Sequence, residues 1–313
     1  MSISDSKKQT HLYNYKNEFN YFIDMFSNNK LPNKILIKGK KGIGKCTFAY
    51  HFINYIFSKN EKNSYDINNL KINEKNKNYI LLNESVHPNI FIIDLDEKKK
   101  SIDIESSREI IKFNNKSSLI NNNKIILIND SEFLNLNSAN ALLKIIEEPN
   151  DKVIFFLIHD IQKIIFDTLK SRCIQFKLNL TEHDKSKIIN SLTEENFSSK
   201  INNDFVHYYN SPGEYINFYY FCIENDIDFK NTNIENFIKL IFNDASLKKN
   251  NFIKNNLNNY LEYFFLKKIN QIYYKDKIYD LYKYFFNKFY NAKKYNLDFE
   301  PLLIEFDTLL LNE

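Results

Sequence analysis

The stretch KILIKGKKGIGKCTFAY, Lys34 to Tyr50, decides the fold of this 313-residue chain. Its first six residues have the apolar pattern of a short strand, and residues Cys46 to Lys59 have the apolar spacing of a helix. Three of the chain's four glycines lie at the junction of the two, at Gly39, Gly42 and Gly44. Glycines at such a junction free backbone N–H groups to wrap a phosphate, and Lys45 adds a positive charge. The stretch predicts a phosphate-binding loop, and a plain Gly-rich turn explains its spacing less well.

Further strand patterns follow this loop and are apolar on both faces, which is typical of a buried parallel sheet in an α/β domain. They lie at Asn89 to Asp94, Lys124 to Asn129 and Lys152 to Ile158. The polar stretch at 59–85 is rich in Asn, Lys and Glu and predicts a loop-rich insertion. After Leu180 the strand signal ends, and amphipathic helical patterns fill the remainder.

Composition limits the class of protein. With 43% hydrophobic residues the chain can form sizeable cores, and its net charge of +4 permits contact with nucleic acid without predicting it. The apolar runs are strand-sized, so we expect no membrane helix, and the N-terminus lacks the pattern of a signal peptide. We therefore expect a cytoplasmic protein. The three cysteines lie far apart without a CxxC pair, which argues against a zinc site or any other metal site: Cys46, Cys173 and Cys222.

The residues that should hold magnesium beside the phosphate loop are altered. Cys46 occupies the position of the usual Ser or Thr ligand, and a thiol is a poor ligand for a hard cation. Thr47 lies about 100° further round the helix, so it is a weak substitute. The strand at Lys124 to Asn129 ends in a neutral amide, and Asp130 faces the other way from it. The sequence predicts that the magnesium site is lost on both sides.

Three stretches together carry a family resemblance: GKKGIGKCTFAY, NDSEFLNLNSANALLKIIEEPND and TLKSRC. They resemble the delta-prime clamp-loader subunits of bacterial DNA polymerase III, members of the AAA+ class, over roughly Leu12 to Leu180 and more loosely to the end. The resemblance implies a RecA-like AAA+ domain with a parallel sheet, a small helical lid and an all-α collar that holds subunits in a ring. The expected boundaries are 1–178 for the P-loop domain, 179–228 for the lid and 229–313 for the collar.

Two further departures from the active relatives concern the nucleotide. His159 stands where a polar Thr or Ser sensor is usual, and Glu214 follows SPG where an Arg usually reaches the γ-phosphate. With Cys46 and Asn129, four nucleotide-contacting positions are altered, so we expect a subunit without its own ATPase activity and without zinc. At most, weak ATP or ADP binding remains at the loop residues Gly39, Gly42, Gly44, Lys45, Cys46 and Thr47. The alternative is a working AAA+ ATPase, a motor subunit or a stand-alone enzyme, in which Thr47 and Asp130 restore the metal site.

Arginine is scarce in this Lys-rich chain and stands only at Arg108 and Arg172. Arg172, with Ser171 in the SRC motif, resembles the arginine finger of clamp loaders, which acts on the ATP of a neighbouring subunit. A planar guanidinium grips two phosphate oxygens, whereas Lys offers one point charge. The alternative is a local salt bridge at a strand edge. We interpret Arg108 as a helix residue for packing or DNA contact, and we assign no catalytic role to Glu147 or Glu148.

The resemblance also implies partners. These are gamma/tau-type motor subunits and a delta subunit in a hetero-pentamer, with the sliding clamp and primer–template DNA contacted through the complex. The aromatic helical patterns late in the chain are expected to form core and subunit interface, and oligomerisation is expected to depend on the segment after about Lys230.

Overall fold

The computed structural model describes residues 5–95, 101–116, 123–148, 152–193, 202–206, 211–244, 246–247, 250–271, 275–295, 297–298 and 300–311. The chain forms two compact units. Unit 1 comprises Met1–Glu194 and Ser211–Ile216, and unit 2 comprises Glu195–Asn210 and Asn217–Glu313.

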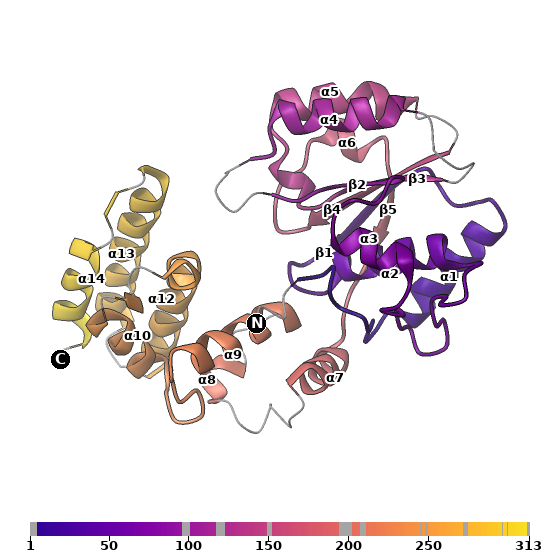
Figure 1. Ribbon diagram of the computed structural model, residues 1–313. Helices are drawn as coiled ribbons and strands as arrows, with labels where there is room; N and C mark the ends of the chain where they lie inside the picture. Colours follow the sequence, from indigo (N-terminus) through magenta and orange to yellow (C-terminus); the bar gives the residue numbers. More distant parts are fainter. Residues whose placement is uncertain are drawn as a thin grey trace. The chain divides into compact units, whose positions relative to one another are not determined.

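Unit 1 is built on a parallel sheet of five strands in the order β2-β3-β4-β1-β5 (Figure 1). Their bounds are β1 Lys34–Gly39, β2 Ile90–Ile93, β3 Lys124–Ile128, β4 Val153–Asp160 and β5 Ile174–Lys177. The parallel α/β sheet and the first four strands are confirmed. The sequence missed β5, which lies at the edge of the sheet and has a mostly exposed IQFK pattern in place of an apolar run.

Helices cover both faces of this sheet (Figure 1). The helices α1 (Lys16–Ser27), α2 (Lys45–Ser58) and α3 (Lys77–Asn83) pack on one face, against a core that includes Ile35 and Ile37. The helices α4 (Ile104–Asn115), α5 (Leu136–Glu147) and α6 (Asp167–Lys170) pack on the other face with Leu36. Alternate residues of β1 thus feed two separate cores, as the pleat of a strand requires.

The insertion at 59–85 contains more structure than its composition predicted. Asn76 caps α3 by accepting from the backbone N–H groups of Asn78 and Tyr79. The Asn76 side chain also donates to Glu61 Oε2 at 2.7 Å. Hydrogen bonds among Asn and Glu side chains therefore shape a segment that lacks apolar periodicity.

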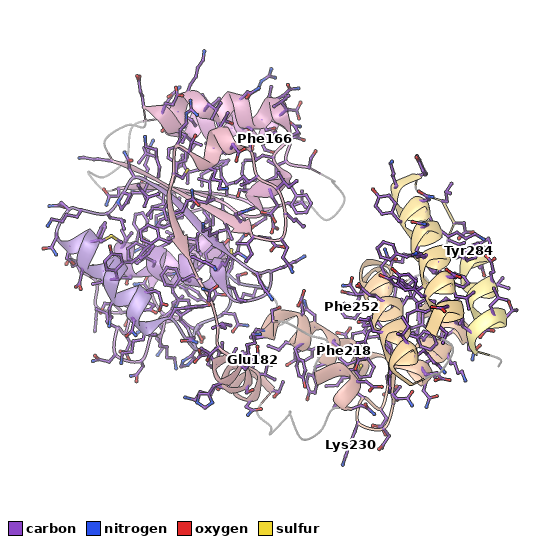
Figure 2. All side chains as sticks on the ribbon, turned by 180° about the vertical axis from the view of Figure 1, so that it is seen from behind. Phe166, Glu182, Phe218, Lys230, Phe252 and Tyr284 are labelled. Atoms are coloured by element: carbon purple, nitrogen blue, oxygen red, sulfur yellow. The ribbon has the colours of Figure 1, made fainter. Side chains whose placement is uncertain are left out.

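The remaining helices are α7 (Glu182–Thr193) in unit 1, α8 (Asn203–Val206), α9 (Pro212–Glu224), α10 (Ile234–Asn243), α12 (Asn251–Gln271), α13 (Lys275–Tyr295), α14 (Glu300–Phe306) and the π-helical turn η3 (Asp307–Leu311). The first turn of α9 belongs to unit 1 and the rest to unit 2. Unit 2 has an aromatic core, in which Phe218 of α9, labelled in Figure 2, stacks on Phe205 with ring centroids 4.7 Å apart. Within the described part of the chain, no helix is long and apolar enough to cross a bilayer.

Candidate functional site

The loop between β1 and α2 has the backbone that its glycines predicted. Gly42 and Gly44 have φ angles of +76° and +88°, in the left-handed region where a side chain is strained. A Cβ at Gly44 would meet nothing within 4 Å, so its backbone angle alone favours glycine there. A Cβ at Gly42 would also lie 2.3 Å from Ser211 Oγ, so there is no room for a side chain at this position.

Lys45, the lysine of the loop, is folded back on its own backbone. Its Nζ donates to the carbonyl oxygens of Gly39 at 2.9 Å and Lys40 at 2.7 Å, and the residue is only 7% exposed. Burial lowers the pKa of Lys45, and the negative charges of Asp160 and Glu132 oppose that shift. The chain's own groups therefore surround the ammonium that would meet a β or γ phosphate.

The first turn of α9 packs directly on this loop. The Gly213 N–H donates to the Gly42 carbonyl at 2.9 Å. A Cβ at Gly213 would lie 2.9 Å from both the Cα and the O of Gly42, so only glycine permits this approach. Two backbones that are distant in sequence thus meet without an intervening side chain.

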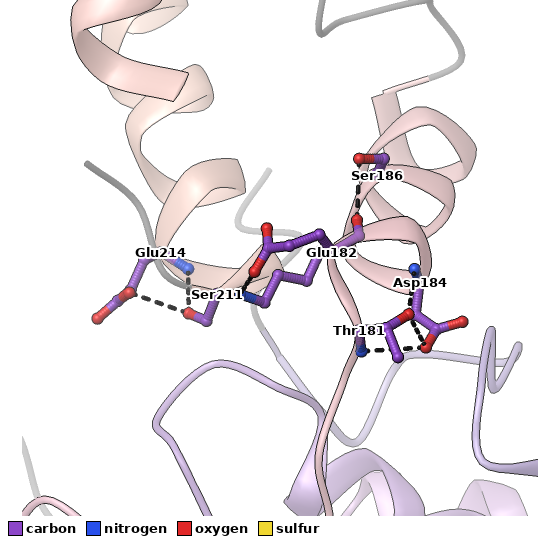
Figure 3. A network of polar contacts seen from close by, with 7 residues as sticks. Thr181, Glu182, Asp184, Ser186, Ser211 and Glu214 are labelled. Carbon is purple, nitrogen blue, oxygen red and sulfur yellow. Dashed lines mark hydrogen bonds and ion pairs between the residues drawn. The ribbon is translucent and has the colours of Figure 1, made fainter. Parts of the chain in front are cut away.

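Ser211 caps the start of α9, and the Glu214 side chain pairs with its hydroxyl (Figure 3). Glu214 N–H donates to Ser211 Oγ, and Ser211 Oγ donates to Glu214 Oε2 at 3.1 Å. Burial raises the pKa of the Glu214 carboxyl, while the Ser211 contact and the nearby charge of Lys41 lower it. Glu214 thus lies close enough to the loop to interact with its charges. At the start of α7, the Thr181 N–H donates to Asp184 Oδ2 and the Asp184 N–H donates to Thr181 Oγ1, which makes a reciprocal capping box.

The N-terminal residues lie against the other side of the loop. The Tyr15 hydroxyl donates to the Ile43 carbonyl at 2.8 Å. Lys7 Nζ pairs with Asp94 Oδ2 at 3.2 Å. Burial raises the pKa of the Cys46 thiol, Asp94 acts in the same direction, and a hydrogen bond with Ser6 opposes the shift. Cys46 therefore stays a neutral thiol at physiological pH, and neutral thiols do not ligate magnesium.

The residues after β3 and at the end of β4 place carboxylates near the loop. Asn129 directly follows β3, while Asp130 has a φ of +49° and begins the short 3₁₀ helix η1 (Ser131–Phe133). Burial raises the pKa of Asp130, and the neighbouring Glu132 charge adds to the shift. His159 and Asp160 are the last two residues of β4 and pair with Lys38 and Gly39 of β1.

Sequence reasoning missed Glu132, whose side chain is only 2% exposed. Its Oε2 accepts from the Asp160 N–H at 3.2 Å and lies 3.4 Å from His159 Nδ1. Burial acts to raise the pKa of Glu132, but the contacts with His159 and the backbone outweigh it, so the pKa is lowered. As one of two acidic residues in the polar NDSEF turn, Glu132 gave no signal that it would be buried. Asn129 is neutral and Cys46 is a thiol, so neither offers the carboxylate or hydroxyl that magnesium prefers, and the loss of the magnesium site stays a prediction.

Arg172 lies in the turn between α6 and β5, away from the loop. Its Nε donates to Glu147 Oε1 at 2.6 Å, and its Nη2 pairs with the same oxygen. Its Nη1 donates to the Thr168 carbonyl at 2.8 Å, and Ser171 Oγ donates to that carbonyl at 3.2 Å. The side chain is 33% exposed. The local salt bridge that was the alternative for Arg172 is therefore present, and an outward role for this side chain stays a prediction.

The two sites lie at opposite ends of β1. Lys34 begins β1, and its Nζ donates to the Glu147 carbonyl at 3.0 Å, while the phosphate loop follows Gly39 at the other end. Ile174, two residues after Arg172, pairs with Ile35. Five steps along a strand span about 16 Å, so Arg172 does not reach a nucleotide in its own loop.

The other candidates lie outside these two sites, and the packing or DNA contact expected of Arg108 stays a prediction. Arg108 is exposed on α4. His87 is a turn residue whose Nδ1 accepts from the Asn89 N–H. Among the residues that the structure describes, no three His, Cys, Asp or Glu side chains are placed to hold a metal ion.

Comparison with known proteins gives a family match over residues 15–182, more than half of the chain, to the family described as DNA polymerase III, delta subunit. The chain belongs to this family. It is 29% identical over 140 residues to the DNA polymerase III subunit delta' of Pseudomonas aeruginosa, covering 45% of this chain and 41% of that protein. It is 29% identical over 181 residues to the subunit delta' of Buchnera aphidicola subsp. Schizaphis graminum, covering 58% and 52%. The chain thus matches about half the length of these delta-prime relatives, and the resemblance noted in the sequence is confirmed.

Two solved structures give low-scoring matches to this chain. A DNA polymerase III gamma subunit-related protein from Thermotoga maritima has a TM-score of 0.48 at 13% identity, covering 93% of this chain and 99% of that one. The RuvB Holliday junction branch migration motor of the same organism has a TM-score of 0.40 at 15% identity, covering 86% and 81%.

Proposed function

We propose that this chain is a non-catalytic, delta-prime-type subunit of a DNA polymerase III clamp loader. It helps to open the sliding clamp and load it on primed DNA in the cytoplasm, within a hetero-pentamer of gamma/tau-type motor subunits and a delta subunit. It contributes Arg172 as an arginine finger to the ATP held by a neighbouring motor subunit. Membership of the delta-subunit family supports this proposal.

The separation of the two sites is the observation that carries the proposal. Lys45 and Gly42 are engaged by the chain's own backbone at one end of β1, whereas Arg172 is partly exposed at the other end. An arginine near the start of a strand that is about 16 Å long, with the phosphate loop at its far end, can act on a triphosphate only in another chain. Loss of ATP hydrolysis at one end of the strand therefore does not prevent an arginine at the other end from acting on the ATP of a neighbouring subunit.

The helical part divides into a lid over 179–228 and a collar over 229–313. The exposed aromatic residues of α13 support a subunit interface, because aromatic side chains are enriched in the cores of interfaces. They are Tyr279, Tyr284, Phe286, Tyr290 and Tyr295.

Reconstitution with the motor and delta subunits tests the finger. Arg172→Ala should join the complex but lower DNA-stimulated ATP hydrolysis at the adjoining site, where such a finger contributes on the order of 10³ in rate in other NTPases. Arg172→Lys should restore only part of the loss, because an ammonium lacks the two-pronged contact. Lys170→Ala, an exposed cation two residues away, is the matched control. Clamp loading should be measured beside phosphate release, because several sites share the ring. Wild-type hydrolysis and clamp loading with Arg172→Ala would refute the finger.

The alternative is a working ATPase in which Thr47 and Asp130 hold the metal. Asp130 begins η1 in a left-handed conformation, and burial raises the pKa of its carboxyl, which disfavours the charged form that a metal needs. Steady ATP hydrolysis by the purified chain that disappears on Lys45→Ala would establish this alternative.

A further inference from the structure

We propose that Glu147 is a positioning residue for Arg172, holding the guanidinium so that its outer N–H groups are presented to phosphate oxygens. This inference rests on the proposed finger and adds a second residue to it. Glu147 itself would touch no nucleotide and would act only through Arg172.

The donor count of Arg172 supports a presenting role. A guanidinium has five N–H donors. Among the described residues, Glu147 accepts from the Nε–H and forms an ion pair with Nη2, and the Thr168 carbonyl accepts one N–H of Nη1. Each terminal nitrogen therefore keeps at least one N–H beyond these contacts, and two such donors can form a fork of the kind that binds two phosphate oxygens. A carboxylate that took both terminal nitrogens would block this fork, and Glu147 does not.

Glu147 is itself held firmly enough to act as a support. It ends α5, whose Leu142 and Ile146 are fully buried. Its carbonyl accepts from Lys34 Nζ at 3.0 Å, which ties the end of α5 to the first residue of β1. The Glu147 backbone is thereby fixed by the core and by a strand.

The position of this carboxylate is unfavourable for its own helix. The C-terminal end of a helix carries partial negative charge, so an anion in the last turn opposes the helix dipole. Glu147 therefore does not stabilise α5 through its charge. Its two contacts with Arg172 give the carboxylate a role in orienting the arginine.

The scarcity of arginine makes this geometry directly measurable. The full chain labelled with ¹⁵N-arginine gives two Nε–H resonances, one from Arg108 and one from Arg172, and Arg108→Lys assigns them. The Arg172 Nε–H should exchange slowly with water. Glu147→Gln should shift this resonance and increase its exchange rate by at least about tenfold, with the Arg108 resonance as internal reference. Glu148→Gln, an exposed glutamate one residue away, should change neither. An unchanged Arg172 resonance in Glu147→Gln would refute the contact.

The second measurement uses the reconstituted complex. Glu147→Gln should lower the kcat of DNA-stimulated ATP hydrolysis about two- to fivefold with little change in KM for ATP, a loss that matches the strength of a partly exposed ion pair. Glu147→Asp should recover part of it, and Glu148→Gln should have no effect. If Arg172→Ala lowers hydrolysis and Glu147→Gln does not, the positioning role is wrong and the finger stands. If Arg172→Ala has no effect, the finger is wrong, and the positioning role that rests on it is wrong too.

Discussion

Substituting Gly213 by alanine tests whether the first turn of α9 is docked on the phosphate loop. The added Cβ would lie 2.9 Å from the Cα and the O of Gly42 and 3.3 Å from its carbonyl carbon. These are backbone atoms of a loop held in a left-handed conformation, so they cannot move aside as a flexible side chain would.

Two effects of opposite sign determine how Gly213→Ala changes the free energy of unfolding. Alanine in place of glycine favours a helix by roughly 0.5–1 kcal/mol, and less in a first turn. Overpacking against an unyielding neighbour costs about 1–3 kcal/mol. The steric clash should outweigh the helix preference of alanine, with a net loss of about 1–2 kcal/mol in the free energy of unfolding. For a domain of this size that corresponds to a fall in Tm of about 2–8 °C.

Thermal unfolding of the full chain measures this loss, and amide hydrogen exchange locates it. The amide of position 213, which donates to the Gly42 carbonyl, should lose protection in Gly213→Ala. Asn217→Ala, an exposed site on the same helix, is the control and should be neutral or slightly stabilising. A Gly213→Ala protein as stable as the wild type, with that amide still protected, would show that the close backbone approach does not exist in solution.

Three further predictions concern other parts of the chain. Burial lowers the pKa of His51 to about 3, so below pH 6.5 the unfolded chain takes up a proton that the folded chain does not. Stability should therefore fall as the pH drops from 6.5 towards 3, by about 2 kcal/mol at pH 5, and urea unfolding of His51→Phe should lack this component. Asn76→Ala should cost about 1–2 kcal/mol in urea unfolding, because it removes the cap of α3, and a neutral result would contradict the capping geometry. Serine at the exposed Tyr279, Phe286 and Tyr290 together should weaken assembly with partner subunits at least about tenfold without changing circular dichroism, and undiminished assembly would exclude α13 from the interface.

The sequence predicted those parts of the fold that depend on local patterns. Strands buried on both faces are visible as continuous apolar runs, so β1, β3 and β4 were placed almost to the residue. The edge strand β5 has no such run, because three of its four side chains are exposed. The helix α3 was hidden for a related reason, since it is set by the Asn76 cap within a polar segment.

Contacts between residues that are far apart in the sequence could not be predicted from local patterns. The Ser-x-x-Glu spacing at Ser211 is a helix-start signal that the sequence displays, but nothing local indicates that Gly213 would meet Gly42. The pairing of Arg172 with Glu147 likewise depends on how α5 and α6 pack together. Residue types predicted which side chains could have a functional role. The partners of those side chains depend on how the helices and strands pack together.

The strand β1 accounts for how the proposed loss of a nucleotide site and the proposed arginine finger can coexist in one chain. Its residues Ile35, Leu36 and Ile37 are almost fully buried, and it is paired on both sides, so its ends are held at a fixed separation. Groups more than about 10 Å apart with no shared partner act nearly independently on stability. Changes at the loop end, such as the thiol at Cys46, therefore place little constraint on the turn that contains Arg172. A phosphate loop engaged by the chain's own backbone and an arginine at the opposite end of β1 are thus compatible within a single domain.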